Sequence, residues 1–225
     1  MITMQEWKAM SGKEQTLWLE ENAELSRRSE SQRGWVEGVG VNDAPYCVSP
    51  GIDGKRVMCP AYSAWKEMLV RAYSEKYLTK RPTYLGVKVC YEWHRFSTFR
   101  AWWIHNQVDG WHIDKDILSD SREYSPETSI FVPVWLNTFT VDRGACRGEH
   151  PIGVNFDTRS GKFRSTCSNL MAKKQEHLGL FHTTEAAHAA WLNRKLELAL
   201  ELKPKMDEID PRIYQRVCEI ISNAK

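Results

Sequence analysis

Two stretches in the middle of the chain gather side chains that could take part in hydrolytic chemistry. Residues 112–116 (HIDKD) bring together an imidazole, an ammonium group and two carboxylates, and residues 127–137 add the hydroxyl of Thr128 and the amide of Asn137. An imidazole can take a proton from water, and carboxylate and amide oxygens are the ligands that Mg²⁺ or Mn²⁺ prefers. The six cysteines lie far apart and form no CxxC pair, so we expect no zinc site and no disulfide framework.

A third stretch, near the C-terminus, is suited to a polyanionic partner. Nine Lys and Arg residues face five Asp and Glu residues between positions 150 and 205, although the whole chain has a net charge of only +2. Side chains alternate along a strand, so one face would bear Lys162, Arg164 and Thr166 and the other Phe163, Ser165 and Cys167. The basic face is therefore a candidate surface for nucleic acid.

The surrounding residues predict a three-stranded sheet covered by one helix. Strands are expected over 152–157, 162–167 and 176–181, with a turn at 158–161. Thr183 is a candidate N-cap for a helix that continues to about Leu202 and is closed by Pro204. Nothing else in the sequence is expected to cover the basic face of the sheet, and an exposed cationic sheet can enter the major groove of DNA.

The same region resembles the plant ethylene-response-factor (APETALA-type) DNA-binding domain, which also occurs in phage and bacterial homing nucleases. The resemblance lies in the order and spacing of Gly153-Val154, GKFRS at 161–165, LGLF at 178–181 and TEAA at 184–187. It implies DNA contacts from Asn155, Arg159, Arg164, Thr166 and Ser168, to which we add the basic residues Lys162, Lys173 and Lys174. Asp157 stands where the family commonly has arginine, so the family's base preference does not carry over.

Helices and short strands are expected to position the two hydrolytic stretches. Apolar residues at helical spacing predict helices over 61–77 and 95–105, and GVKVCY at 86–91 predicts a strand between them. A strand and turn over 110–118 and a short helix beginning within 134–140 would then carry the candidate residues.

Residues 86–140 resemble a divergent HNH (ββα-metal) nuclease of the kind found in phage homing endonucleases. The similarity lies in ETSIFVPVWLN at 127–137, which follows the family pattern ending on a helix Asn, and in WHIDKD at 111–116, which resembles the family's D-H-I-D-G element. It implies metal-assisted cleavage of DNA with one Mg²⁺ or Mn²⁺.

The chain can be aligned with the motif of the HNH family in two ways. If the histidines are aligned, His112 is the base, but a tryptophan replaces the acidic ligand. If the spacing to Asn137 is aligned, Asp114 and Lys115 occupy the Asp-His position, which leaves lysine in place of the base. The candidates are therefore His112, Lys115 and Thr128 for catalysis, with Thr128 in place of the family's central Asn, and Asp114, Asp116 and Asn137 for the metal.

These patterns predict an α+β protein: a divergent ββα-metal (HNH-like) central domain plus a C-terminal three-stranded antiparallel sheet packed on a helix. The expected domains are a polar helical arm (1–34), the HNH-like domain (35–145), the ethylene-response-factor-like domain (150–203) and a C-terminal helix (205–225). The composition, 42% hydrophobic and 27% charged, is that of a globular protein, and the apolar runs are too short to span a membrane.

The two resemblances together imply a metal-dependent, homing-type DNA endonuclease that acts on double-stranded DNA. The first residues lack the order of a signal peptide, so we expect a cytoplasmic protein, of phage origin and active in the host cell. The alternative is a catalytically inactive, sequence-specific DNA-binding regulator, or a phage factor that acts on a host protein partner.

Overall fold

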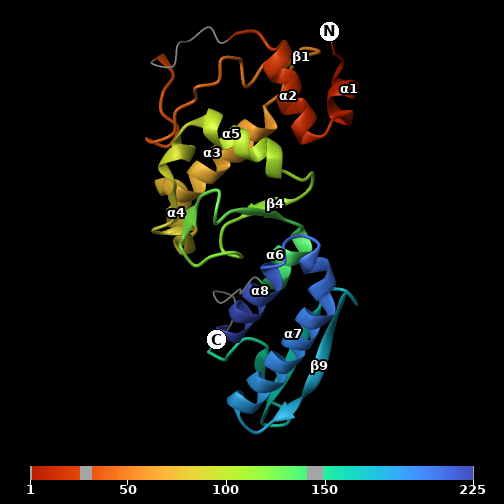
Figure 1. Cartoon of the computed structure of the whole chain (residues 1–225). Helices are drawn as coiled ribbons and strands as arrows, with labels where there is room; N and C mark the ends of the chain where they lie inside the picture. The colour runs from red at the N-terminus through yellow and green to blue at the C-terminus, as the bar shows by residue number, and fades with distance from the viewer. Residues whose placement is uncertain (1, 26–31, 141–148, 225) are drawn as a thin grey trace. The chain divides into compact units, whose positions relative to one another are not determined.

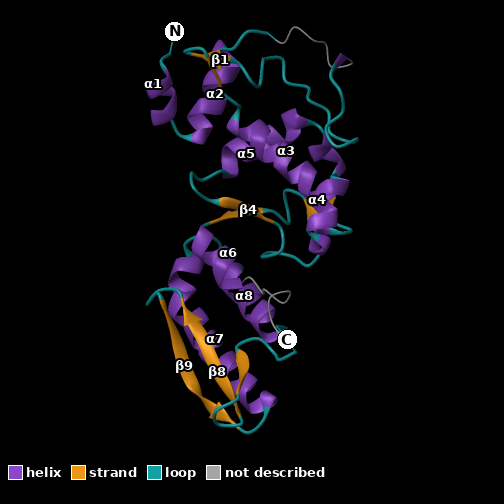
Figure 2. Cartoon of the chain, turned by 180° about the vertical axis from the view of Figure 1, so that it is seen from behind, coloured by secondary structure: helices purple, strands orange, loops and turns teal. Residues whose placement is uncertain are grey.

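The computed structural model describes residues 2–25, 32–140 and 149–224, which form two compact units, Met1–Phe131 and Val132–Lys225 (Figures 1 and 2). Both helices and strands contribute, so the expected α+β class is confirmed. None of the described helices is long and apolar enough to cross a bilayer.

The first unit begins with two short helices, α1 (Met4–Ala9) and α2 (Gly12–Asn22). Each starts with a reciprocal capping box, in which the N-cap hydroxyl and a glutamate three residues later satisfy each other's backbone N–H groups. Trp7 and Leu19 from these helices are buried in the main core of the unit. The polar N-terminal segment is thus docked by its few apolar residues.

The core of the first unit is aromatic and lies between α3 (Pro60–Tyr73) and α5 (Phe96–Asn106). Trp65, Trp93 and Phe96 are fully buried there, and the indole Nε1 of Trp65 donates to the carbonyl oxygen of Trp93 at 2.7 Å. This bond satisfies the polar atom of the indole and so offsets the cost of removing its N–H group from water.

The single helix expected over 61–77 is wrong in one respect, because two helices occupy this stretch. Ser74 adopts an extended conformation that ends α3, and α4 (Glu75–Lys80) starts directly after it. The break leaves Tyr73 beside β3 (Lys88–Val89), where its hydroxyl accepts from the backbone N–H of Val89 at 3.0 Å.

Short strand pairs and single-turn helices complete the first unit. The strands β1 (Gly51–Ile52) and β2 (Lys55–Arg56) form an antiparallel hairpin, and β3 pairs in parallel with β5 (Glu123–Tyr124). The strand β4 (His112–Asp114) pairs with β6 (Ile130–Val132). The 3₁₀ turns are η2 (Pro82–Tyr84) and η3 (Tyr91–His94).

The second unit contains the expected sheet, with antiparallel order β7-β8-β9. Its strands are β7 (Val154–Asp157), β8 (Lys162–Asn169) and β9 (Lys174–Phe181), and its helices are α6 (Val134–Thr140), α7 (Thr184–Asp207) and α8 (Ile213–Ser222). The long helix α7 covers one face of the sheet, and α8 packs against α7 (Figure 2).

The contact between α7 and the sheet is close. Thr183 caps the helix as expected, because its hydroxyl accepts from the N–H of Ala186 at 3.2 Å. Gly153 adopts φ +81° directly beside the indole of Trp191, where a Cβ atom would lie 2.2 Å from the ring. The expectation that Pro204 closes this helix is wrong, since α7 continues to Asp207. Leu202 and Met206, on either side of the proline, are buried, which offsets the lost backbone hydrogen bond.

Candidate functional site

One face of the C-terminal sheet is exposed, and the alternation of β8 decides which residues it carries. Ser165 and Cys167 are buried beneath α7, whereas Arg164 and Ser168 point to the opposite face and are exposed. Cross-strand pairing adds Asn155 from β7, opposite Arg164. We call this surface the open face; it consists of Asn155, Asp157, Lys162, Arg164, Thr166, Ser168, Gln175, His177 and Leu180.

A bulge in β9 determines which side chains of that strand reach the open face. His177 pairs with Thr166 and Gly179 with Ser165, so Leu178 is an extra residue between the two pairs. Gly179 has φ +137°, a conformation that other residues rarely adopt. Because of the extra residue, Leu180 shares the face of His177, and both stay exposed.

The open face contains a shallow hollow of about 370 Å³. It is lined by Arg164, Thr166, Gln175, His177 and Leu180. The amide Nε2 of Gln175 donates to the hydroxyl of Thr166 at 3.1 Å, which fixes the orientation of the amide. A guanidinium, an amide, an imidazole and an apolar side chain therefore surround one depression, a combination that can contact base edges as well as phosphates.

The eight residues predicted to contact DNA all belong to the sheet or its turns. Arg159 lies in the turn between β7 and β8, and Lys173 in the turn between β8 and β9, so they flank the two ends of β8. Six of the eight are exposed, and the other two, Lys162 and Thr166, are half-buried; the exposed ones are Asn155, Arg159, Arg164, Ser168, Lys173 and Lys174.

Arg164 does not extend freely into solvent. Its Nη2 donates to Asp157 Oδ1 at 2.9 Å, and Ser160 Oγ donates to Asp157 Oδ2 at 2.7 Å. The pKa of Asp157 is lowered, first by the Ser160 hydroxyl and then by the charge of Arg164. The carboxylate therefore stays ionised beside the guanidinium.

Some of the basic residues that gave this segment its positive charge have partners away from the open face. Arg194, on α7, forms ion pairs with Glu176, Glu197 and Glu201, at 2.6, 3.0 and 3.1 Å. Lys195 lies 3.7 Å above the ring of Phe139, and burial lowers its pKa. The charge excess counted along the sequence thus overstates the charge available to a ligand.

In the first unit, the Asp114 side chain binds backbone N–H groups at the end of β4. Its Oδ1 accepts from the backbone N–H groups of Asp116 at 2.8 Å and of Ile117 at 2.9 Å, which closes the turn after the strand. Burial raises the pKa of Asp114, and those two N–H groups partly oppose the rise.

Lys115 is buried, with only 4% of its surface exposed. Its ammonium lies 5.9 Å from the ring centre of Tyr84 and 5.7 Å from that of Tyr124, and it forms an ion pair with Asp116. Two aromatic faces and a carboxylate stabilise the buried charge. An ammonium held in this way is a poor substitute for a base that must take a proton from water.

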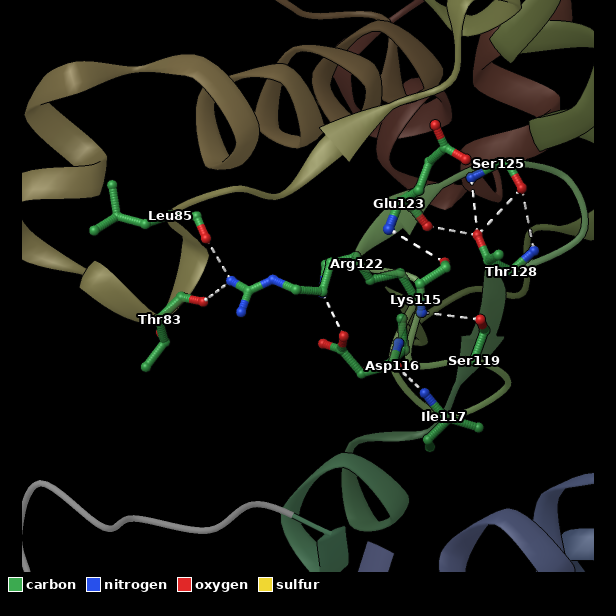
Figure 3. A network of polar contacts seen from close by, with 12 residues as sticks. Thr83, Leu85, Lys115, Asp116, Ile117, Ser119, Arg122, Glu123, Ser125 and Thr128 are labelled. Atoms are coloured by element: carbon green, nitrogen blue, oxygen red, sulfur yellow. Dashed lines mark hydrogen bonds and ion pairs between the residues drawn. The ribbon is translucent and has the colours of Figure 1, made fainter.

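The Thr128 hydroxyl stabilises the turn that precedes β6 through two hydrogen bonds. Its hydroxyl donates to the carbonyl oxygen of Glu123 at 2.6 Å and accepts from the backbone N–H of Ser125 at 3.0 Å (Figure 3). Nearby, Arg122 donates to the carbonyl oxygens of Thr83 and Leu85, at 2.7 and 2.6 Å. The structure therefore gives Thr128 a role in loop geometry.

The candidate ligands as arranged do not fit a divalent metal. One oxygen of Asp114 is taken by two backbone N–H groups, and Asp116 is neutralised by Lys115, whose positive charge would repel the ion. Among the described residues, no group of three or more His, Cys, Asp or Glu side chains gathers as metal ligands would. His112 is exposed on β4, and Asn137 is half-buried on α6 of the second unit.

Three residues that line the hollow are absent from the sequence-based prediction: Gln175, His177 and Leu180. Only the bulge at Leu178 gives these side chains a common face, because a strict period of two along β9 would place Leu180 on the opposite face from the other two. The one signal in the sequence was Gly179, because a glycine inside a strand often marks a bulge.

Comparison of the chain with protein-family models, with curated proteins and with solved structures finds no match. A function for this chain is therefore inferred from its own residues.

Proposed function

We propose that this protein binds double-stranded DNA through the open face of its C-terminal sheet. The observation that supports this most strongly is the hollow lined by Arg164, Thr166, Gln175, His177 and Leu180 on a face that α7 leaves exposed. Guanidinium and amide groups can pair with the acceptors and donors of purines in the major groove, and an exposed leucine suits the methyl group of thymine.

The dimensions of the sheet suit a duplex. Side chains on one face of a strand are about 6.8 Å apart, which equals about two base-pair steps of B-DNA. Arg159 and Lys173 flank the eight residues of β8, a length of about 24 Å. The two ends can therefore contact phosphates while the centre of the open face meets the bases.

The test is a binding titration of the full chain with Arg164→Ala, using fluorescence anisotropy and a labelled duplex. We expect a loss of about 5- to 150-fold in affinity, because one arginine contact to a base edge contributes about 1–3 kcal/mol. Arg212→Ala is the matched control: this arginine precedes α8, is 64% exposed and pairs with Asp210. Affinity that is equal in the two variants would contradict the assignment of the open face.

A second candidate function is cleavage of the bound DNA. It is supported by the order of elements, since the pair β4–β6 is followed directly by α6, as in a ββα nuclease. Any metal used would need ligands other than the Asp114 and Asp116 carboxylates in their present arrangement.

Cleavage is tested by incubating supercoiled plasmid with the protein and Mg²⁺ or Mn²⁺, with EDTA as the blank. His112→Ala and Asn137→Ala should abolish a genuine activity, whereas Thr138→Ala, at an exposed neighbour on α6, should retain it. Asp114→Ala is unsuitable alone, because it also opens the turn after β4. Plasmid that stays intact under conditions where the duplex is bound would leave DNA binding without cleavage.

A further inference from the structure

The contact between Asp157 and Arg164 has a consequence for how DNA would be recognised. Asp157 pairs with Lys162 across the β7–β8 ladder, so its side chain lies diagonally across from Arg164 on the same face. The Asp157 side chain is only 13% exposed, whereas the Arg164 side chain is 47% exposed. The acid is therefore enclosed at the strand end, and the guanidinium it holds points outward.

The carboxylate is itself fixed in place. The Ser160 hydroxyl binds its second oxygen, and the backbone carbonyl of Asp157 accepts from the N–H of Gly161 at 2.9 Å, which closes the hairpin turn. Gly161 has φ +66°, as such a turn requires. Arg164 is thus tied to a rigid turn and not to a flexible side chain.

We propose that Asp157 is a specificity-determining residue, which holds the Arg164 guanidinium over the open face so that it contacts a base edge instead of swinging to a phosphate. This inference rests on the proposed DNA binding. An arginine has five N–H donors, and the bond to Asp157 uses one of them, so others remain for the two acceptors of guanine.

The same carboxylate weakens binding to sequences that offer no suitable base. It neutralises much of the charge that Arg164 would otherwise offer to a phosphate, and it repels the backbone of the duplex. Only a base that accepts the held guanidinium compensates for this loss, so the preference for one sequence over another increases. A preorganised arginine also loses less side-chain entropy on binding.

The test begins with selection of preferred duplexes from a random-sequence library by the wild-type chain. Affinities for the selected duplex and for a scrambled duplex are then measured for the wild type and for Asp157→Asn, which keeps an oxygen for the Ser160 hydroxyl and removes the charge. We expect tighter binding to the scrambled duplex and a fall of about fivefold in the ratio of the two affinities. The plot of log affinity against log salt should also steepen by about 0.9, as expected for one additional phosphate contact.

Two controls separate this mechanism from a simple change of charge. Glu185→Gln removes one charge near the start of α7, where the carboxylate binds Thr184 and not Arg164, so the affinity ratio should stay constant. In an Arg164→Ala background, Asp157→Asn should no longer change the ratio. A ratio that is unchanged in Asp157→Asn, or changed equally in both backgrounds, would overturn the inference.

These outcomes are distinct from failure of the proposed function. A wild-type chain that binds neither duplex and enriches no sequence would refute DNA binding itself. A chain that binds, depends on Arg164 and keeps its affinity ratio in Asp157→Asn would refute only the role of Asp157.

Discussion

Replacing Gly153 with alanine should loosen the sheet from the helix that supports it. The residue has φ +81°, and an added Cβ would lie 2.2 Å from Cδ1 and 2.4 Å from Cγ of Trp191, which is only 5% exposed. The left-handed conformation costs an alanine about 1–2 kcal/mol, and overpacking against a buried ring costs about 1–3 kcal/mol. We expect Gly153→Ala to lower the free energy of unfolding of the second unit by about 2–5 kcal/mol.

The matched control is Gly161→Ala. This glycine has φ +66°, and no atom lies within 4 Å of the position that an added Cβ would occupy, so the variant carries the conformational cost alone. Hydrogen–deuterium exchange into the full chain, followed by mass spectrometry of its peptides from β8 and α7, measures the stability of this unit separately. Equal losses in the two variants would mean that Trp191 moves aside freely, and the argument from close packing between β7 and α7 would be wrong.

Two further predictions concern charges that stabilise the fold. The Arg194 guanidinium, followed by the Asn169 amide, lowers the pKa of Glu176 from 4.5 to about 2. The ionised carboxylate therefore stabilises the folded chain above pH 4.5, and this stabilisation is lost as the pH falls toward 2. Over that range the urea midpoint of the wild type should fall more steeply than that of Glu176→Gln. Asp43 Oδ1 accepts from the N–H of Ser97 at 2.8 Å and so caps α5, whose N-cap residue makes no side-chain hydrogen bond to the helix. Asp43→Ala should lower the free energy of unfolding, measured by chemical denaturation, by about 1 kcal/mol, whereas Asp43→Asn should retain most of the cap. No acid dependence in the first case, or equal losses in the second, would contradict these assignments.

Local sequence signals were sufficient for the strand order of the C-terminal sheet and for the start of α7. The alternation in residues 162–167 predicted which side chains of β8 are buried, because a strand facing one helix can bury only every second residue. Thr183 marked the start of α7, since a hydroxyl before a helix satisfies its first N–H groups locally. The same reasoning failed at Pro204, where burial of Leu202 and Met206 maintains the helix.

Tertiary structure decided the positions and partners of the charged residues. A count of charges along the chain gives Arg164 and Arg194 the same weight of one positive charge each. In the folded structure Arg164 lies on the open face, whereas Arg194 is surrounded by three glutamates. The alignment on Asn137 suggested Asp114 as a metal ligand and placed Lys115 at the position of the base, but the fold uses the acid to close a turn and buries the amine between two tyrosines. The sequence by itself determined periodicity and capping, which depend on neighbours along the chain; ion pairing and burial depend on residues distant in sequence, so only the folded structure determined them.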